Sequence, residues 1–426
     1  MRQIVVRPAP PALVLAIIAV ITLATGSASG HSYLVSTDPP DGSALSTAPR
    51  QVILTFSLPV VPSLADVSVV DDRGLNVAGT AVAAIPGAPS ALVVDLPPLP
   101  SGGYRLAWRA VAASDLHVTS GSLVFGIGMP APAPAAQPAA SANPLEVLLR
   151  WLQTTGLAVL GGALTLIVII QRRSPLGDDW LAAATAPARL RRRLHGLAAL
   201  GAGGGLASGG ALFALQASVA GAAQGPAAET AGTVPWQRAL TTDFGIASLA
   251  SEALLLAILV LAIRSRRAPA LSSDGAPDRG SFRLSRSEVA GILTLAVLAL
   301  VQALAGHVAT GPDSERPVRT AALAAHLFAV WAWFGGLLVL SLAVLPLLRR
   351  GAAERLLARN VLRRFWLIAV PALGVLAVTG LYLSGQFVAT VDALILSPYG
   401  QALTVKGGLV AAAVLLGLRN SASLHP

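Results

Sequence analysis

A histidine stands at position 31, directly after the small residues of the stretch GSASGHSYLVS. If the chain is cut before His31, this residue offers the α-amine and the ring Nδ1, which together can chelate a metal ion. The nearest other histidine is His117, in AASDLHVTSG, with Asp115 two residues before it. In a strand, this spacing places both side chains on one face. Three nitrogens and one carboxylate oxygen form a ligand set suited to Cu(II).

A cleavage before His31 is predicted by the residues that precede it. Arg2 and Arg7 form a positive region, PALVLAIIAVITLA is an apolar core of signal-peptide length, and Ala28 and Gly30 are small residues at −3 and −1. The apolar core is shorter than the ~20 residues that a spanning anchor helix needs. We therefore expect a signal peptide over residues 1–30. The alternatives are an uncleaved anchor and, for Asp115 and His117, a surface ion pair.

Composition predicts an integral membrane protein with nitrogen and oxygen metal ligands. The 426 residues are 54% hydrophobic and 12% charged, with a mean hydropathy of +0.70. The chain has no cysteine, and Met1 and Met129 are its two methionines, which favours Cu(II) or Zn(II) over Cu(I). Its net charge of +10 comes almost entirely from arginines beside apolar segments. We interpret these as topology signals rather than as a nucleic-acid surface.

Residues 31–128 are predicted to form an exported all-β domain. Short β-favouring runs alternate with turn signals such as DPPDG, DDRG and PSGG. About seven short strands over this length are typical of a small antiparallel, immunoglobulin-like sandwich. Residues 129–144, MPAPAPAAQPAASANP, read as an extended Pro/Ala linker.

Residues 145–426 are predicted to form an all-α polytopic transmembrane bundle of about seven helices. Arginine is concentrated in alternate loops: the loops after the first, third and fifth segments hold six arginines each, whereas the intervening loops hold Arg238, Arg316 and Arg319. Arginine marks cytoplasmic loops, so we expect the β domain outside the cell membrane and the C-terminus in the cytoplasm. The apolar segments are residues 145–170, 195–217, 245–263, 288–305, 320–348, 365–387 and 402–419.

Two histidines occur at the predicted outer ends of adjacent helices. His307 follows the fourth apolar segment, and His326 lies about 9 Å into the fifth. An ionisable residue inside a span is costly and is a functional candidate by default. Together the two side chains could receive a metal ion at an outward-facing mouth. The alternative is that His326 hydrogen-bonds a neighbouring helix and that His307 faces water.

Three further ionisable residues have weaker claims to a role. Glu252 lies inside the third apolar segment, near its outer third, where it could bind a cation, relay protons or face a wet interior. His195 follows RLRRR and is interpreted as an interfacial residue. His425 lies near the cytoplasmic end of the chain, where it could be an exit ligand.

The β domain resembles the CopC family of exported copper-binding sandwich proteins. The resemblance rests on HSYLVSTDPPDGSALSTAPRQVILTFSLPV and YRLAWRAVAASDLHVTSGSLVFGIG. It implies that His31, Asp115 and His117 bind Cu(II). The chain departs from the family at Leu116, where glycine is usual. It also departs at Val118, where proline is usual, and at Leu58, where an acid is common.

The helices from the fourth apolar segment onward resemble the CopD family of membrane proteins linked to copper uptake, which often follow a CopC domain. The resemblance rests on the segment with His307 and His326, on FWLIAVPALGVLAVTGLYLSGQF and on SPYGQALTVKGGLVAAAVLLGLRN. It implies that the two histidines are intramembrane copper ligands. Tyr382, Tyr399 and Lys406 fall in recurrent motifs of unknown role.

These features favour a non-enzymatic function in which the outer domain binds copper and the bundle carries it, most simply inward. A membrane or periplasmic copper acceptor is a further partner to consider. No nucleotide-binding loop is present, which argues against direct ATP drive. Two alternatives stay open: an oxidative enzyme that uses a histidine brace, and a b-type haem protein with His307 and His326 as axial ligands.

The cleavage signal generates the first testable prediction. The mature protein should begin at His31, because only a free α-amine can complete the chelate. N-terminal sequencing of the purified protein is the measurement. Retention of residues 1–30 would contradict the proposed ligand set, since the amine would then be locked in a peptide bond.

Overall fold

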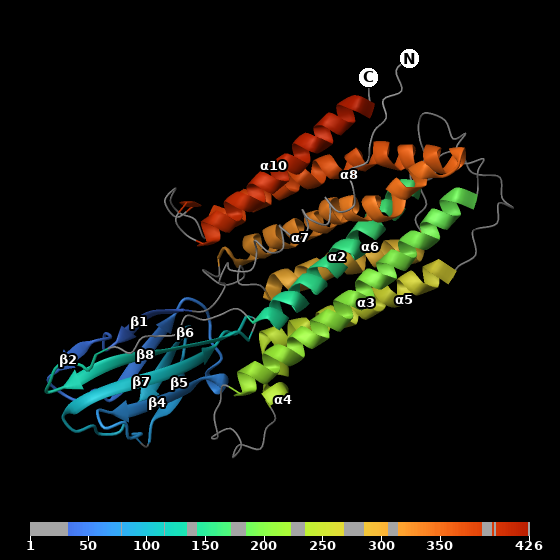
Figure 1. Ribbon diagram of the computed structural model, residues 1–426. Helices are drawn as coiled ribbons and strands as arrows, with labels where there is room; N and C mark the ends of the chain where they lie inside the picture. The colour runs from blue at the N-terminus through green and yellow to red at the C-terminus, as the bar shows by residue number, and fades with distance from the viewer. Residues whose placement is uncertain are drawn as a thin grey trace.

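The computed structural model shows a β domain attached to one end of a bundle of long helices (Figure 1). The confirmed fold class is therefore a two-sheet β domain followed by an apolar helical bundle. The structure describes residues 33–77, 79–114, 116–133, 143–171, 185–222, 235–267, 285–305, 314–385, 394–395 and 398–424.

The β domain contains eight strands in two four-stranded sheets, ordered β1-β3-β6-β5 and β2-β8-β7-β4. The sequence predicted about seven strands. Strands β1, β2 and β5 are the ones whose residues form no clear β-favouring run. The expected antiparallel pairing holds except between β2 and β8, which are parallel. The strands are β1 (Leu34–Asp38), β2 (Ser43–Leu45), β3 (Gln51–Phe56), β4 (Asp66–Asp71), β5 (Ala81–Ile85), β6 (Ala88–Asp95), β7 (Gly102–Val111) and β8 (Val118–Ile127), with a 3₁₀ turn η1 (Pro62–Leu64) after β3.

Alternating side chains build the core between the two sheets. In β7, Leu106 and Trp108 point inward, whereas Arg109 points outward, as a two-residue period requires. Trp108 meets Phe56 of β3 edge to face, with ring centroids 5.2 Å apart. This inter-sheet packing gives the domain a core without disulfides.

Six helices are long and apolar enough to cross a membrane, among the residues that the structure describes. The last predicted segment corresponds to α10, in which the shorter stretch Gly400–Leu415 is apolar. The helices are α2 (Pro144–Gln171), α3 (Thr185–Ala222), the short α4 (Pro235–Leu240), α5 (Asp243–Arg267), α6 (Arg286–Ala305), α7 (Arg316–Val339), α8 (Ala352–Gly385) and α10 (Pro398–Leu424). A π-helical turn η5 (Leu340–Val344) and a 3₁₀ turn η6 (Leu345–Arg349) continue α7.

Helix α2 lies at the centre of the bundle and touches its neighbours backbone to backbone. A side chain at Gly162 would overlap the carbonyl oxygen of Gly335 on α7. A side chain at Gly156 would come within 2.9 Å of the Gly201 oxygen on α3. Small residues at these crossings allow the close approach on which helix packing in membranes depends.

An apolar cluster joins the β domain to the bundle. Leu64, Val111 and Leu116 come from the β domain, while Ala217 of α3 and Ala239 of α4 come from the helices. All of them are buried. The loop between β7 and β8 is therefore held against the near end of the helices.

A buried ionic cluster lies at the opposite end of the bundle, around Glu288 of α6. Its Oε1 accepts hydrogen bonds from Gln171 of α2 (2.6 Å) and from Arg191 of α3 (3.1 Å), and it lies 3.4 Å from His195 Nε2. Ser285 and Glu288 form a reciprocal capping box at the start of α6. His195, interpreted from the sequence as an interfacial residue, is 2% exposed and packs among the helices beside Glu288.

The Glu288 cluster generates a stability prediction. Glu288→Ala leaves Arg191 and His195 without their buried anionic neighbour and should lower the free energy of unfolding by about 3–5 kcal/mol. Denaturant unfolding of the purified protein in detergent measures this. The control is Asp72→Ala, because Asp72 is exposed on the β domain and its loss should change stability by no more than about 0.5 kcal/mol. Equal stabilities of the two variants would contradict a role for the cluster in joining the helices.

Candidate functional site

The loop from Ala112 to His117 connects β7 to β8 and carries the predicted outer-domain ligands. Its ends are closed by a hydrogen bond from Ala112 N to His117 O (2.9 Å), and Leu116 N donates to Ala112 O (3.0 Å). Strand β8 begins at Val118. The expectation that Asp115 and His117 share a strand face was therefore wrong at His117, because this residue lies in the turn before the strand.

Leu116 gives the loop its unusual backbone. Its φ is +57°, in the left-handed region, while its side chain is only 1% exposed. For an L-residue this conformation costs about 1–2 kcal/mol. Burying a leucine side chain contributes about 1.5–3 kcal/mol. Contact of the Leu116 side chain with the apolar cluster at the bundle thus offsets this backbone strain. A glycine at position 116 would have no such strain.

His117 faces a carboxylate of the helical bundle. Its Nδ1 lies 3.8 Å from Oε1 of Glu146, in the first turn of α2. The same Glu146 oxygen accepts a hydrogen bond from Arg150 Nε at 2.9 Å, one turn further along α2. The His117 side chain is 22% exposed, so it remains partly accessible to a ligand.

The start of the described chain lies near this loop. Tyr33 N donates to Ser57 Oγ (3.1 Å), and Ser57 N donates to Tyr33 O (2.9 Å). Two residues later, Pro59 O accepts a hydrogen bond from Ala113 N (2.9 Å). The segment after β3 therefore brings the N-terminal end of the described chain and the His117 loop to the same end of the sandwich.

The other predicted ligands are only partly within the described chain. His31, Asp115 and His307 lie outside the described residues. Within the described ranges, no three His, Asp or Glu side chains converge as a metal site. The structure therefore places His117 and His326 and leaves the complete ligand sets as predictions.

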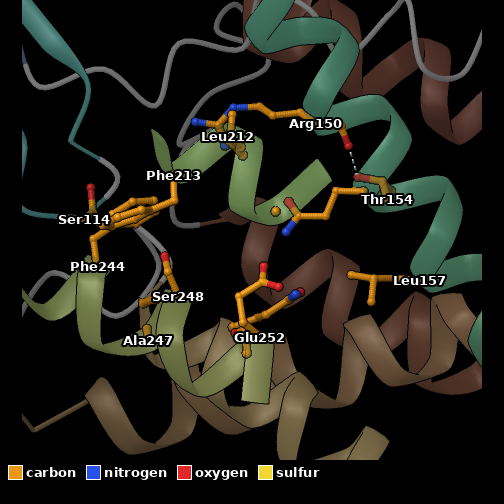
Figure 2. A pocket seen from close by; sticks show the side chains of 15 residues that line it. Ser114, Arg150, Thr154, Leu157, Leu212, Phe213, Phe244, Ala247, Ser248 and Glu252 are labelled. Atoms are coloured by element: carbon orange, nitrogen blue, oxygen red, sulfur yellow. Dashed lines mark hydrogen bonds between the residues drawn. The ribbon is translucent and has the colours of Figure 1, made fainter. Parts of the chain in front are cut away.

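A cavity of about 300 Å³ opens beside the loop, between α2, α3, α5 and α6 (Figure 2). Ser114 of the loop contributes to its rim, where Phe213 of α3 stacks on Phe244 of α5. Figure 2 shows Glu252 of α5 pointing into the cavity from below. Polar side chains from α2, α5 and α6 thus line this space, while α3 contributes glycine and apolar residues.

His326 lies within α7, which begins at Arg316, ten residues or about 15 Å along the helix before it. His326 Nδ1 lies 2.9 Å from Thr379 Oγ1 on α8. The Thr379 hydroxyl donates its proton to the Val375 carbonyl, so it must accept from His326 Nδ1. In the neutral ring, this assignment places the proton on Nδ1 and leaves the lone pair of Nε2 available to bind a metal ion.

The sequence interpretation did not identify Glu146 and Glu288. The Ser285–Glu288 capping box was readable as the pattern SRSE before an apolar run. Glu146 carries no local signal, because its nearness to His117 depends on how the β domain meets α2. Thr379 likewise becomes relevant only through packing of α8 on α7.

Comparison with known proteins finds families that match the β domain and the C-terminal helices. The family described as CopC domain matches residues 34–128, and the family described as Copper resistance protein D matches residues 359–426. Copper transport protein CutJ of Bacillus subtilis (strain 168) is 28% identical over 425 residues, covering 91% of this chain and 67% of that protein.

Free-standing relatives match the β domain. Copper resistance protein C of Xanthomonas campestris pv. juglandis is 36% identical over 113 residues, covering 25% of this chain and 87% of that protein. The crystal structure of CopC from Methylosinus trichosporium OB3b is 27% identical, with a TM-score of 0.22, and covers 25% of this chain and 100% of that one.

The geometry of the loop generates a binding prediction. His117→Ala should weaken Cu(II) binding by the full-length protein more than Asp115→Ala, because nitrogen is the better Cu(II) donor. Competition titration with a chelator of known affinity measures this. Asp95→Asn is the control, since Asp95 accepts from Gln51 on the sheet surface. Wild-type affinity in a folded His117→Ala variant would exclude this residue as a ligand.

Proposed function

The chain belongs to the copper resistance protein C family through its β domain and carries a copper resistance protein D domain at its C-terminal end, and from this we propose that it captures Cu(II) outside the cell membrane and carries copper inward. Copper is the cargo, and the contribution is to copper homeostasis and resistance. The observation that carries the proposal is the position of His117, which lies on the β domain with its ring 3.8 Å from Glu146 in the first turn of α2.

The proposed outer site consists of His31, Asp115 and His117. Tyr33 is held by Ser57, and two residues span at most about 7 Å, so a histidine at position 31 is tethered near this end of the sandwich. The adjoining Pro59 holds the loop that carries His117. The absence of cysteine and the scarcity of methionine favour Cu(II) as the bound form.

The proposed orientation places the β domain outside and the C-terminus in the cytoplasm. Arginines gather at helix ends far from the β domain, as in the last turn of α5, where Arg264, Arg266 and Arg267 lie. The first turns of α3 carry Arg189, Arg191, Arg192 and Arg193 at the same end of the bundle. This is the pattern of cytoplasmic ends in multi-pass proteins.

His326 is the proposed ligand inside the bundle, together with His307. The hydrogen bond to Thr379 orients the ring, with Nδ1 engaged by α8. Such a partner on the second ring nitrogen is the usual arrangement of a metal-binding histidine. The chain thereby has nitrogen ligands both outside and within the membrane.

Copper accumulation tests the proposed function. Cells that express the protein should accumulate more copper than cells without it, and the His307→Ala, His326→Ala double variant should lose most of this gain while retaining Cu(II) binding outside. Elemental analysis of washed cells is the measurement. Equal accumulation with and without the wild-type protein would overturn uptake.

A conservative substitution at His326 distinguishes a copper ligand from a residue that only hydrogen-bonds α7 to α8. His326→Gln can still hydrogen-bond Thr379 but lacks the imidazole nitrogen that binds copper. We expect it to accumulate as little copper as His326→Ala. Wild-type accumulation by His326→Gln would instead assign His326 a structural role on α7.

A further inference from the structure

The cavity under the β domain contains a carboxylate, Glu252, that forms no ion pair with any described residue. Glu252 lies nine residues after Asp243, at the start of α5, or about 14 Å along the helix. Within the described part of the chain, no lysine or arginine comes within ion-pair distance of it. An uncompensated carboxylate inside a span is costly. A bound cation would remove that cost.

The cavity supplies further donors to such a cation. The residues that line it include Gln153 of α2 and Gln302 of α6, which carry amide groups, and Thr154, Ser248 and Ser251, which carry hydroxyls. Carboxylate, amide and hydroxyl oxygens are ligands for divalent cations in proteins. The nearby guanidinium of Arg150 is already engaged with Glu146.

A glycine keeps this space open. A side chain at Gly209 of α3 would overlap Oε1 of Glu252 and lie 2.8 Å from Nε2 of Gln153. At Gly210, the next residue, an added side chain would meet nothing within 4 Å. The close approach of the Glu252 and Gln153 side chains therefore depends on the missing side chain at position 209.

One face of α2 connects the cavity to the outer-domain loop. Glu146, Arg150, Gln153 and Thr154 recur at helical spacing, so they follow each other along that face. The first of them lies 3.8 Å from His117, and the other three line the cavity. Glu146, Gln153 and Thr154 thus place oxygen atoms along this face, and the Arg150 guanidinium between them pairs with Glu146.

We propose that this cavity is a cation-binding vestibule in which Glu252, with Gln153 beside it, receives the copper ion released by the outer domain. The proposal rests on the proposed function and adds an intermediate site to it. The ion passes from nitrogen ligands on the β domain to oxygen ligands at the mouth of the bundle. Weaker oxygen ligation suits a transfer site, because the ion must also leave it.

The first experiment counts copper bound by the purified full-length protein in detergent. Equilibrium dialysis against Cu(II) should show that Glu252→Gln retains one copper equivalent fewer than wild type. The Cu(II) electron paramagnetic resonance signal of the outer domain should be unchanged. Glu252→Asp, which keeps the charge, should retain the equivalent, and Glu315→Gln is the control for removing a carboxylate outside the cavity.

The second experiment measures copper uptake by proteoliposomes. Glu252→Gln should lower the initial rate by about tenfold, a change of about 1.4 kcal/mol. Gly209→Ala should also lower the rate, whereas Gly210→Ala should match wild type. This pair changes the same residue type on the same helix and differs only in whether the new methyl group enters the cavity.

The outcomes distinguish the vestibule from the proposed function. If wild-type proteoliposomes take up no copper, the proposed function fails. If they do, and Glu252→Gln matches wild type in both binding and rate, the vestibule is overturned. A lower rate with an unchanged copper count would also overturn it, because Glu252 would then act on something other than the bound ion. A misfolded Glu252→Gln variant leaves the Gly209→Ala and Gly210→Ala pair to decide.

Discussion

The central position of α2 is the constraint on which the rest of the structure depends. Glycines at its crossings with α3 and α7 bring backbones into direct contact, so α2 has little freedom to slide or rotate. Its first turn presents Glu146 to the β domain, and its last residue, Gln171, donates to Glu288. Because a helix rises 1.5 Å per residue, these two ends lie about 38 Å apart. One rigid helix therefore sets the distance between the outer loop and the far end of the bundle.

The two carboxylates in the bundle illustrate how polar groups are used there. Glu288 accepts hydrogen bonds from α2 and α3 and from its own capping serine, so its burial is compensated and it joins helices. Glu252 faces a cavity and has no such set of donors among the described residues. A buried charge without partners is retained only where it has another use. The contrast separates a carboxylate that joins helices at one end of the bundle from the carboxylate of the proposed vestibule at the other.

Much of the architecture could be predicted from local patterns. The two-residue period of β7 and the long apolar runs of the helices depend on side-chain polarity alone, so both domains were foreseeable. Strands β1, β2 and β5 were harder to predict, because they are short and depend on pairing with neighbours. The burial of His195 could not be predicted for a similar reason: its sequence context is a run of arginines, while its buried neighbour Glu288 lies 93 positions away in the sequence.

The sequence predicted which residue types form the outer site, but it did not predict the conformation of the loop that carries them. Histidine and aspartate before β8 indicated a metal site, yet the turn there depends on Leu116, whose positive φ no propensity predicts. That conformation is affordable only while the leucine side chain is buried against Ala217, Phe213 and Phe244 of the bundle. If the β domain moved away, the strain would remain and the burial would be lost. The shape of the loop and the docking of the domain are therefore coupled, so the helices help to hold His117 in the place where it faces Glu146.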